Sequence, residues 1–380
     1  MLKQLSKGRT FILLSLAHTV SGLCWIVPLL LPLIREELHL TYTQGGLLLT
    51  CYFIVFLIFA LLSGYLGDMY EARKVLSFGF FVTAATFSLL IISQSYLQIL
   101  AVLCLIAVGV SVFYPVGMAS ISRRWQKGLF FGLFGAAGGT GVLMATLLFS
   151  PLVVSLGWRL TAFVLALPSL PRGLAFLTSR VSLKPEDPTS QPKITSPAIK
   201  SLILFYLARG AQMFGGTAVI SFMPLFAVDV GGLLPEKASL FLIFLWAGGV
   251  PAGLVYGILS DVCSPLRIIL VLLLTTIPTV FLVTLSLPLL VIFPLLIALG
   301  FCSVGAWVPQ NIWLGRVTPE RTRGKVFGGI LSLLGLANIS SPVFFGFLAD
   351  TWGLVAMYRL ALLPMIIAAV LLGKLVREAH

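Results

Sequence analysis

Two related stretches of sequence each lie between long apolar runs and decide the fold. The first reads Gly64-Tyr-Leu66-Gly-Asp68-Met-Tyr-Glu-Ala-Arg73-Lys74-Val-Leu76. The second reads Gly257-Ile-Leu259-Ser-Asp261-Val-Cys-Ser-Pro-Leu-Arg267, and its aspartate follows the first by 193 residues, about half of the 380-residue chain. In each stretch a basic residue lies six positions after the aspartate. This repetition predicts two related halves, each with a charged loop at the same place.

The composition predicts that lipid surrounds the chain. Hydrophobic residues make up 59% of it, charged residues only 10%, and the mean hydropathy is +1.09, whereas soluble domains carry roughly 25% charged residues. Backbone polar groups in lipid must bond within the protein, which restricts spanning structures to helices and closed barrels. The apolar runs are about 20 residues long and do not alternate, which favours helices. The predicted fold class is therefore all-α and integral to the membrane.

The apolar runs predict twelve spans in two groups of six. Residues 1–178 would form one six-helix bundle and residues 200–380 the other, with the polar, proline-rich segment 179–199 as a linker between them. The twelve expected spans are 11–34, 45–67, 75–93, 97–121, 128–150, 159–178, 200–228, 238–260, 267–287, 289–315, 325–348 and 354–375.

The basic residues predict the orientation. The formal charge of +13 occurs in short clusters between apolar runs, which fits membrane topology and lipid headgroups and gives no basis for nucleic-acid binding. With the N-terminus inside, the inner segments hold 20 basic residues and the outer loops four. The positive-inside rule then predicts that both termini and the linker are cytoplasmic, in a multi-pass protein of the inner (plasma) membrane.

Further repeats support the duplication. Leu105-Ile-Ala-Val-Gly109 recurs as Leu296-Ile-Ala-Leu-Gly300, and Ser150-Pro151 recurs as Ser341-Pro342, each 191 positions later. Two like bundles related by an axis along the membrane normal, with a site between them, are an established transporter plan.

With these motifs in place, the chain resembles the major facilitator superfamily (MFS), whose loop motif is G-x-L-A-D-R-x-G-R-K-x-x-L. Met69, Glu71 and Ala72 depart from that motif. The resemblance implies alternating access between two bundles and a cytoplasmic gating motif. That motif comprises Gly64, Asp68, Arg73, Lys74, Gly257, Asp261 and Arg267. Within the family, the chain most resembles the fosmidomycin-resistance-like exporters. His18 and the segments 40–46, 109–115, 128–139 and 358–364 carry this resemblance.

Arg209 is the strongest candidate for contact with a solute. It lies about 13 Å inside the seventh span if that span starts near Lys200, and a charge at that depth marks a cavity or a partner by default. Gln212 is one turn further on the same face. The alternative is a structural arginine that bonds to carbonyl groups.

Other polar and aromatic residues within spans are candidates for the same cavity. His18 is the one histidine inside a span, and Trp25, seven positions later, is expected on the same helical face. A proton relay or plain packing would both explain the histidine. No acid is expected at the midplane, which favours an uncharged, amphipathic or anionic solute. The remaining cavity candidates are Tyr114, Trp246, Gln310, Asn311 and Asn338.

The function predicted from these residues is the movement of a small solute by a transporter with rocker-switch alternating access. No phosphate-binding loop, metal motif or hydrolase motif occurs in the sequence, so we expect no enzyme activity, no cofactor and no metal. The expected partners are a small-molecule substrate and the lipid bilayer, with the protein as a monomer. Two alternatives remain: a proton-coupled multidrug or antibiotic exporter, and a membrane receptor or scaffold that does not transport.

Overall fold

The structure, a computed structural model, describes residues 2–125, 128–179, 196–285, 287–318 and 320–378. Side chains are described in these ranges except at 2–7, 68, 122–124, 196–199 and 320–332. Every element in these ranges is a helix. Of the expected linker at 179–199, residues 180–195 lie outside the described residues, and residues 196–199 belong to the first turn of α9 (Ser196–Ser221).

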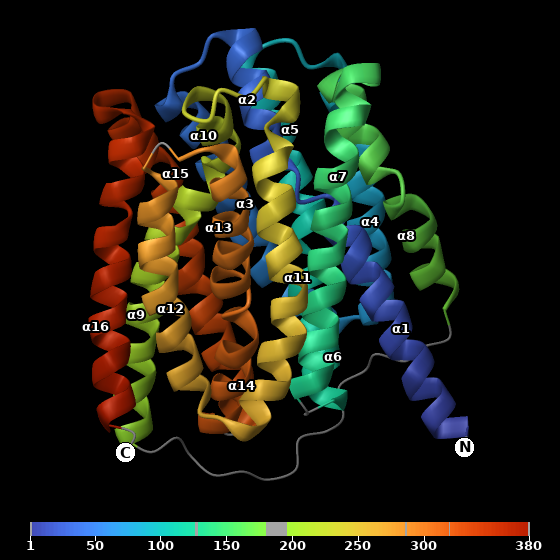
Figure 1. The fold of residues 1–380 in the computed structure, drawn as a ribbon. Helices are drawn as coiled ribbons and strands as arrows, with labels where there is room; N and C mark the ends of the chain where they lie inside the picture. Colours follow the sequence, from blue (N-terminus) through green and yellow to red (C-terminus); the bar gives the residue numbers. More distant parts are fainter. Residues whose placement is uncertain (1, 126–127, 180–195, 286, 319, 379–380) are drawn as a thin grey trace.

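The helices of the first half run up and down the bundle in Figure 1. In chain order they are α1 (Leu2–Leu23), α2 (Val27–Leu38), α3 (Tyr42–Met69), α4 (Ala72–Ser88) with the short η1 (Leu89–Ile92), α5 (Tyr96–Ser111), α6 (Phe113–Arg124), α7 (Gly128–Ala166) and α8 (Ser169–Thr178).

The second half repeats this arrangement. Its elements are α9 (Ser196–Ser221), α10 (Met223–Asp229), the short η2 (Pro235–Lys237), α11 (Ser239–Val262), α12 (Pro265–Val283), α13 (Leu289–Ser303), α14 (Trp307–Val317), α15 (Glu320–Leu360) and α16 (Leu362–Glu378). Leu2 and Glu378 lie at the same end of the bundle, here called the lower end; α2 and α10 lie at the upper end (Figure 1).

The apolar runs account for twelve membrane crossings. In the described residues, ten helical runs are long and apolar enough to cross a membrane. Two of them, Gly128–Thr178 with 51 residues and Leu333–Glu378 with 46, have twice the length that one crossing needs. Each leaves the helical conformation at a glycine with positive φ, Gly157 at 73° and Gly353 at 80°, so each supplies two crossings.

The helix breaks repeat between the halves. The first span breaks before α2, whose N-cap is Ile26, and the seventh breaks before α10, whose N-cap is Phe222, 196 positions later. A proline follows two positions after each cap, where a helix start tolerates the missing N–H. Gly157 and Gly353 are also 196 positions apart. This matching supports two copies of one six-span unit.

In each half, an arginine also binds the C-terminal end of the third span of that half at the upper end. Arg159 donates through Nε to the carbonyl of Ser93 at 2.8 Å, where the third span ends. Arg359 donates through Nε to Thr284 Oγ1 at 3.1 Å, where the ninth span ends. A cation at a helix C-terminus satisfies carbonyls that have no partner in the helix and opposes the helix dipole.

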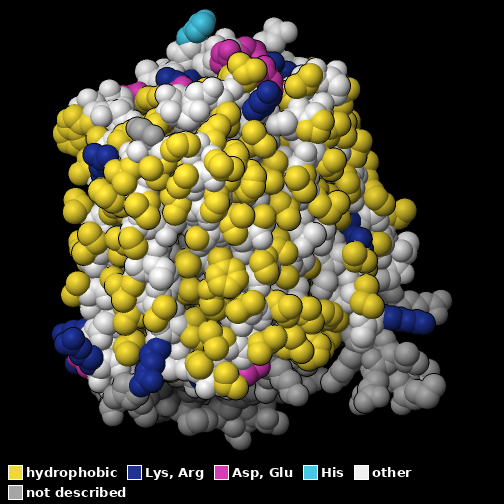
Figure 2. Space-filling view, viewed as in Figure 1, with side chains coloured by type: hydrophobic (Ala, Val, Ile, Leu, Met, Phe, Trp, Pro, Cys, Tyr) yellow, Lys and Arg dark blue, Asp and Glu magenta, His cyan; other side chains and the backbone are white. Residues whose placement is uncertain are grey.

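The surface matches a protein that lipid surrounds. Hydrophobic side chains cover most of the middle of the face in Figure 2, while charged side chains gather toward its two ends. Large apolar side chains such as Val262, Leu290 and Val154 are more than three-quarters exposed, which would be costly in water.

The halves meet along two helix pairs, α7 with α11 and α3 with α15. Glycines set the distance between α7 and α11. A Cβ atom at Gly128 would lie 2.4 Å from the carbonyl oxygen of Gly257, and one at Gly132 would lie 2.7 Å from that of Gly253. Small residues at such crossings let two backbones approach within van der Waals contact.

Candidate functional site

The first copy of the loop motif is organised around Glu71. Arg73 donates through Nε to Glu71 at 2.8 Å and through Nη1 to the carbonyl of Ser179 at 2.6 Å, and Lys74 Nζ lies 3.8 Å from the same carboxylate. Glu71 stands at a position where the family motif differs, so this local partner was not expected from the motif. Asp68 lies in the last turn of α3, just before this loop, and its side chain lies outside the described residues.

The second copy makes a contact between the halves. Asp261 Oδ1 accepts the backbone N–H of Gly128 at 3.3 Å, and Gly128 is the first residue of α7. An acid at a helix N-terminus satisfies a free N–H and complements the helix dipole. Gly257 lies one turn before Asp261 against Gly128, and Gly64 faces Pro115 of α6. Arg267 is exposed at the start of α12.

The upper end is closed by a carboxylate that the sequence did not indicate. Asp350 on α15 accepts the backbone N–H groups of Tyr42 and Thr43, both at 2.8 Å, and the Thr43 hydroxyl at 2.5 Å. Tyr42 and Thr43 are the first two residues of α3, whose N–H groups have no partner within the helix. The second half therefore caps a helix of the first.

A second polar contact joins the halves at the same end. Arg35 on α2 donates to Asp229 at the end of α10 at 2.8 Å, and the hydroxyl of Tyr42 donates to the same carboxylate at 2.6 Å. The Arg35 guanidinium also lies 4.2 Å from the centre of the Tyr42 ring. Asp229 thus binds two groups of the first half at once.

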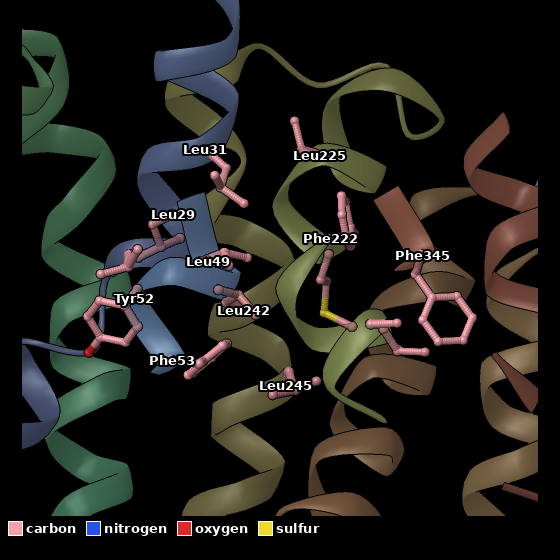
Figure 3. Close-up of a cluster of buried hydrophobic side chains, with 14 of the residues drawn as sticks. Leu29, Leu31, Leu49, Tyr52, Phe53, Phe222, Leu225, Leu242, Leu245 and Phe345 are labelled. Carbon is pink, nitrogen blue, oxygen red and sulfur yellow. The ribbon is translucent and has the colours of Figure 1, made fainter. Parts of the chain in front are cut away.

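Below these contacts an apolar cluster fills the space between the halves (Figure 3). Its side chains come from α2, α3, α10, α11 and α15 and converge from both halves. The labelled members are Leu29, Leu31, Leu49, Tyr52, Phe53, Phe222, Leu225, Leu242, Leu245 and Phe345. The polar contacts and this cluster together close the upper end to water.

Arg209 is a buried cation without an acid. Its side chain is 1% exposed, donates through Nε to Gln310 Oε1 at 2.6 Å, and donates through Nη1 to Gln212 Oε1. No Asp or Glu among the residues with described side chains comes within 4 Å of its nitrogen atoms. The structure thus brings together three predicted residues, Arg209 and Gln212 from α9 and Gln310 from α14.

Three other predicted residues meet between the halves. Tyr114 of α6 and Trp307 of α14 form an edge-to-face pair with ring centres 6.0 Å apart, and Asn311 is buried one turn after Trp307 on α14. Trp246 of α11 approaches α7 at Gly139. These side chains place aromatic and amide groups of both halves where the halves meet.

His18 packs closely against α7. Its Nδ1 donates to the carbonyl of Phe134 at 2.8 Å, and its ring stacks on Phe134 with centres 4.3 Å apart. A Cβ atom at Gly138 would lie 2.5 Å from Nε2, so the ring edge lies directly on the α7 backbone. Because a carbonyl only accepts, this contact leaves Nε2 as the atom that could take up a proton.

Trp25 and Asn338 lie apart from these groups. Trp25 was expected on the same helical face as His18, but α1 ends at Leu23, so that spacing does not apply. Trp25 is 40% exposed beside Phe56. Asn338 accepts the hydroxyl of Thr217 at 2.6 Å, and both belong to the second half.

Two six-span bundles that face each other, with aromatic and amide side chains between them, define a helical membrane carrier. The sequence model of the Major Facilitator Superfamily matches residues 11–250 and again 205–380. The chain belongs to that superfamily, which confirms the resemblance and the all-α membrane fold. It is a multi-pass membrane transport protein and not an enzyme.

The chain is also similar in sequence or in fold to known transport proteins. An uncharacterized MFS-type transporter of Bacillus subtilis, YfnC, is 23% identical over 97% of this chain and 94% of its own length. The fosmidomycin resistance protein of Escherichia coli is 23% identical over 64% of this chain and 63% of its own. The fold is similar to that of a bacterial homolog of the human lysosomal transporter Spinster, crystallised inward-facing and occupied. The TM-score is 0.78 with 17% identity, covering 98% of this chain and 97% of that one.

Proposed function

We propose that the protein moves a small amphipathic or anionic solute by rocker-switch alternating access. In this motion the bundles 1–178 and 200–380 tilt against each other. The observation that carries the proposal is Arg209, a fully buried guanidinium bound only by neutral amides in the described part of the chain. A charge in a span is costly unless it faces a partner or a pathway. A solute that brings negative charge would offset that cost.

The contacts between the halves support the rocking motion. The polar contacts at the upper end are partly exposed: Asp350 with the start of α3, and Arg35 with Asp229. Partly exposed ion pairs contribute only about 0–1 kcal/mol each. Contacts of this strength can form and break within one transport cycle, while the Arg159 and Arg359 contacts keep each half intact.

The orientation and assembly state are part of this proposal. We place the lower end in the cytoplasm of the inner (plasma) membrane, with both termini there, because the segments expected at that end hold most of the basic residues. The protein would act as a monomer, with residues 179–199 as the tether between the two bundles.

A proton-coupled drug exporter is the second candidate, and the free Nε2 of His18 favours it. Two observations weigh against it. The His18 ring lies against Phe134 and the Gly138 backbone, and the acids of the sequence lie at span ends or in loops. A transport assay with and without a pH gradient distinguishes the two candidates.

The test of alternating access needs no knowledge of the solute. The five cysteines would be replaced, and spin labels attached at His39→Cys and Gly232→Cys, one in each half at the upper end. We expect two distance populations in nanodiscs, for the closed and open upper end. A single narrow distance at this end, and at a matched lower-end pair under every condition, would instead indicate a receptor or scaffold that does not transport.

A further inference from the structure

The contacts around Arg209 leave donors unused. A guanidinium carries five N–H groups in a fixed planar fork, and the contacts to Gln310 and Gln212 use one on Nε and one on Nη1. These two contacts account for two of the five N–H groups of the guanidinium. Arg209 is therefore held in place by two amides while part of its fork stays available.

Gln310 provides a second, independent sign of a missing ligand. It is 1% exposed, and its Nε2 has no hydrogen-bond partner in the structure, although its Oε1 accepts from Arg209. A buried amide nitrogen without a partner costs about 1–3 kcal/mol. The unpaired N–H groups are on the same amide that contacts the guanidinium, so the donors of Arg209 and Gln310 adjoin each other between α9 and α14.

The charge around these donors limits what can bind to them. The Arg209 guanidinium carries one positive charge, and among the residues with described side chains no acid lies within 4 Å of its nitrogen atoms. A monoanion would bring the site to neutrality. A dianion would leave a net negative charge inside a span, which costs several kcal/mol, and a neutral solute would leave the cation uncompensated.

The shape of the donors and the surroundings narrow the class further. A planar fork matches a planar two-oxygen acceptor, which it binds with two parallel bonds. The neighbouring side chains are apolar and aromatic: Phe205 and Trp313 pack with ring centres 4.3 Å apart one turn from Arg209 and Gln310, and Leu333 lies against Gly210. These groups suit a solute with a small apolar body.

We propose that Arg209 and Gln310, oriented by Gln212, form the binding site for the carboxylate of a small organic monoanion. This inference rests on the proposed function and names its substrate class. The guanidinium and the free Gln310 amide donate to the carboxylate oxygens, and the apolar body lies toward Phe205 of α9 and Trp313 of α14.

Matched ligands test the charge requirement on the full-length protein in nanodiscs. Benzoate, benzamide and terephthalate share one ring and carry one, no and two negative charges at pH 7.5; acetate and 1-naphthoate extend the monocarboxylate series in size. Binding would be followed by tryptophan fluorescence, since Trp307 and Trp313 are on α14, and by thermal stabilisation. We expect saturable binding by at least one monocarboxylate, and benzoate binding at least about 10-fold tighter than benzamide and terephthalate.

Variants test the residues. Arg209→Gln should weaken monocarboxylate binding about 10- to 100-fold, as loss of charge-assisted bonds does. Arg209→Lys, which keeps the charge but not the fork, should weaken it less. Gln310→Met should also weaken it. Arg316→Gln is the matched control, because Arg316 lies six positions after Gln310 on α14, is exposed and bonds to the Ser260 carbonyl; it should bind as the wild type does.

The results separate this site from the proposed function. Absence of binding by every monocarboxylate, equal binding of benzoate and benzamide, or undiminished binding by Arg209→Gln and Arg209→Lys would each overturn the anion site. The spin-label distances would still report whether the halves exchange. Conversely, selective benzoate binding with a single fixed distance would retain the site and reject alternating access.

Discussion

Asp350 accepts the backbone N–H of Tyr42 at 2.8 Å although the two residues are 308 positions apart in the chain. The contact means that the first turn of α3, in the first half, is completed by an acid from the second half. When the upper end opens, α3 must lose this cap and expose its free N–H groups to water. The closed state of the upper end is thereby coupled to the stability of one helix terminus.

Replacing Asp350 with Asn should populate the open upper end. Asn turns one acceptor oxygen into an NH₂ group that repels the N–H of Tyr42 or Thr43. Loss of a helix cap costs about 0.5–2 kcal/mol, so the closed-to-open ratio should fall about 2- to 30-fold. The spin-label distances at His39→Cys and Gly232→Cys measure the ratio directly, and an unchanged distribution would show that the cap does not hold this end shut.

The Arg35–Asp229 pair should act on the same equilibrium, more weakly. Arg35→Gln removes one partly exposed ion pair, worth about 0.2–1 kcal/mol, so we expect a small shift toward the open upper end that high salt reduces in the wild type.

The matched control for that pair is Arg159→Gln. Arg159 binds Glu37 at 2.7 Å at the same end and with similar exposure, but both residues belong to the first half. The Arg159→Gln variant should lower the thermal stability without changing the spin-label distance distribution. Equal shifts from both variants would mean that the Arg35–Asp229 contact has no special role between the halves.

The glycine contacts of α7 and α11 should tolerate no side chain. Gly132→Ala places a Cβ atom 2.7 Å from the carbonyl oxygen of Gly253, and such overpacking typically costs about 1–3 kcal/mol. We expect a lower unfolding midpoint in detergent. Gly373→Ala on α16 is the control, since nothing lies within 4 Å of the added atom; it should be neutral or stabilising by up to about 1 kcal/mol.

Asp68→Asn tests the lower-end motif as a latch between two states. We predict that the purified variant folds normally but changes the accessibility of both ends to a membrane-impermeant thiol reagent, because the loop biases an equilibrium and does not form the core. Reporter cysteines at His39 and at the native, exposed Cys263 would follow the two ends. Unchanged labelling at both would leave Asp68 a topology-setting charge only.

The sequence predicted the spans well because length and hydropathy alone define them. It did not predict the breaks before α2 and α10, since apolar residues continue through Ile26 and Phe222 and lipid imposes no alternation that a break would interrupt. For the same reason Trp25 was placed on the face of His18, although α1 ends between them.

The candidate site was predicted in part. A buried arginine in a span is conspicuous in one sequence, and Arg209 with Gln212 follows from helical spacing. Its contact with Gln310 joins α9 to α14 and has no local pattern. Asp350 was read only as an acid at a span end, because its partners Tyr42 and Thr43 offer backbone groups, which every residue type has. A search for acids near the expected N-termini of spans in the other half could have found it.

The contacts of Arg159 with Ser93 and of Arg359 with Thr284 allow the two halves to be compared within one molecule. Arg159 and Arg359 make corresponding contacts in two copies of one unit, yet among the residues with described side chains only Arg159 also binds an acid, Glu37. Any treatment that weakens ionic contacts should therefore soften the first copy more than the second. Hydrogen exchange of the backbone amides near Ser93 and near Thr284, compared within a single sample, would measure the difference in local stability between the two halves.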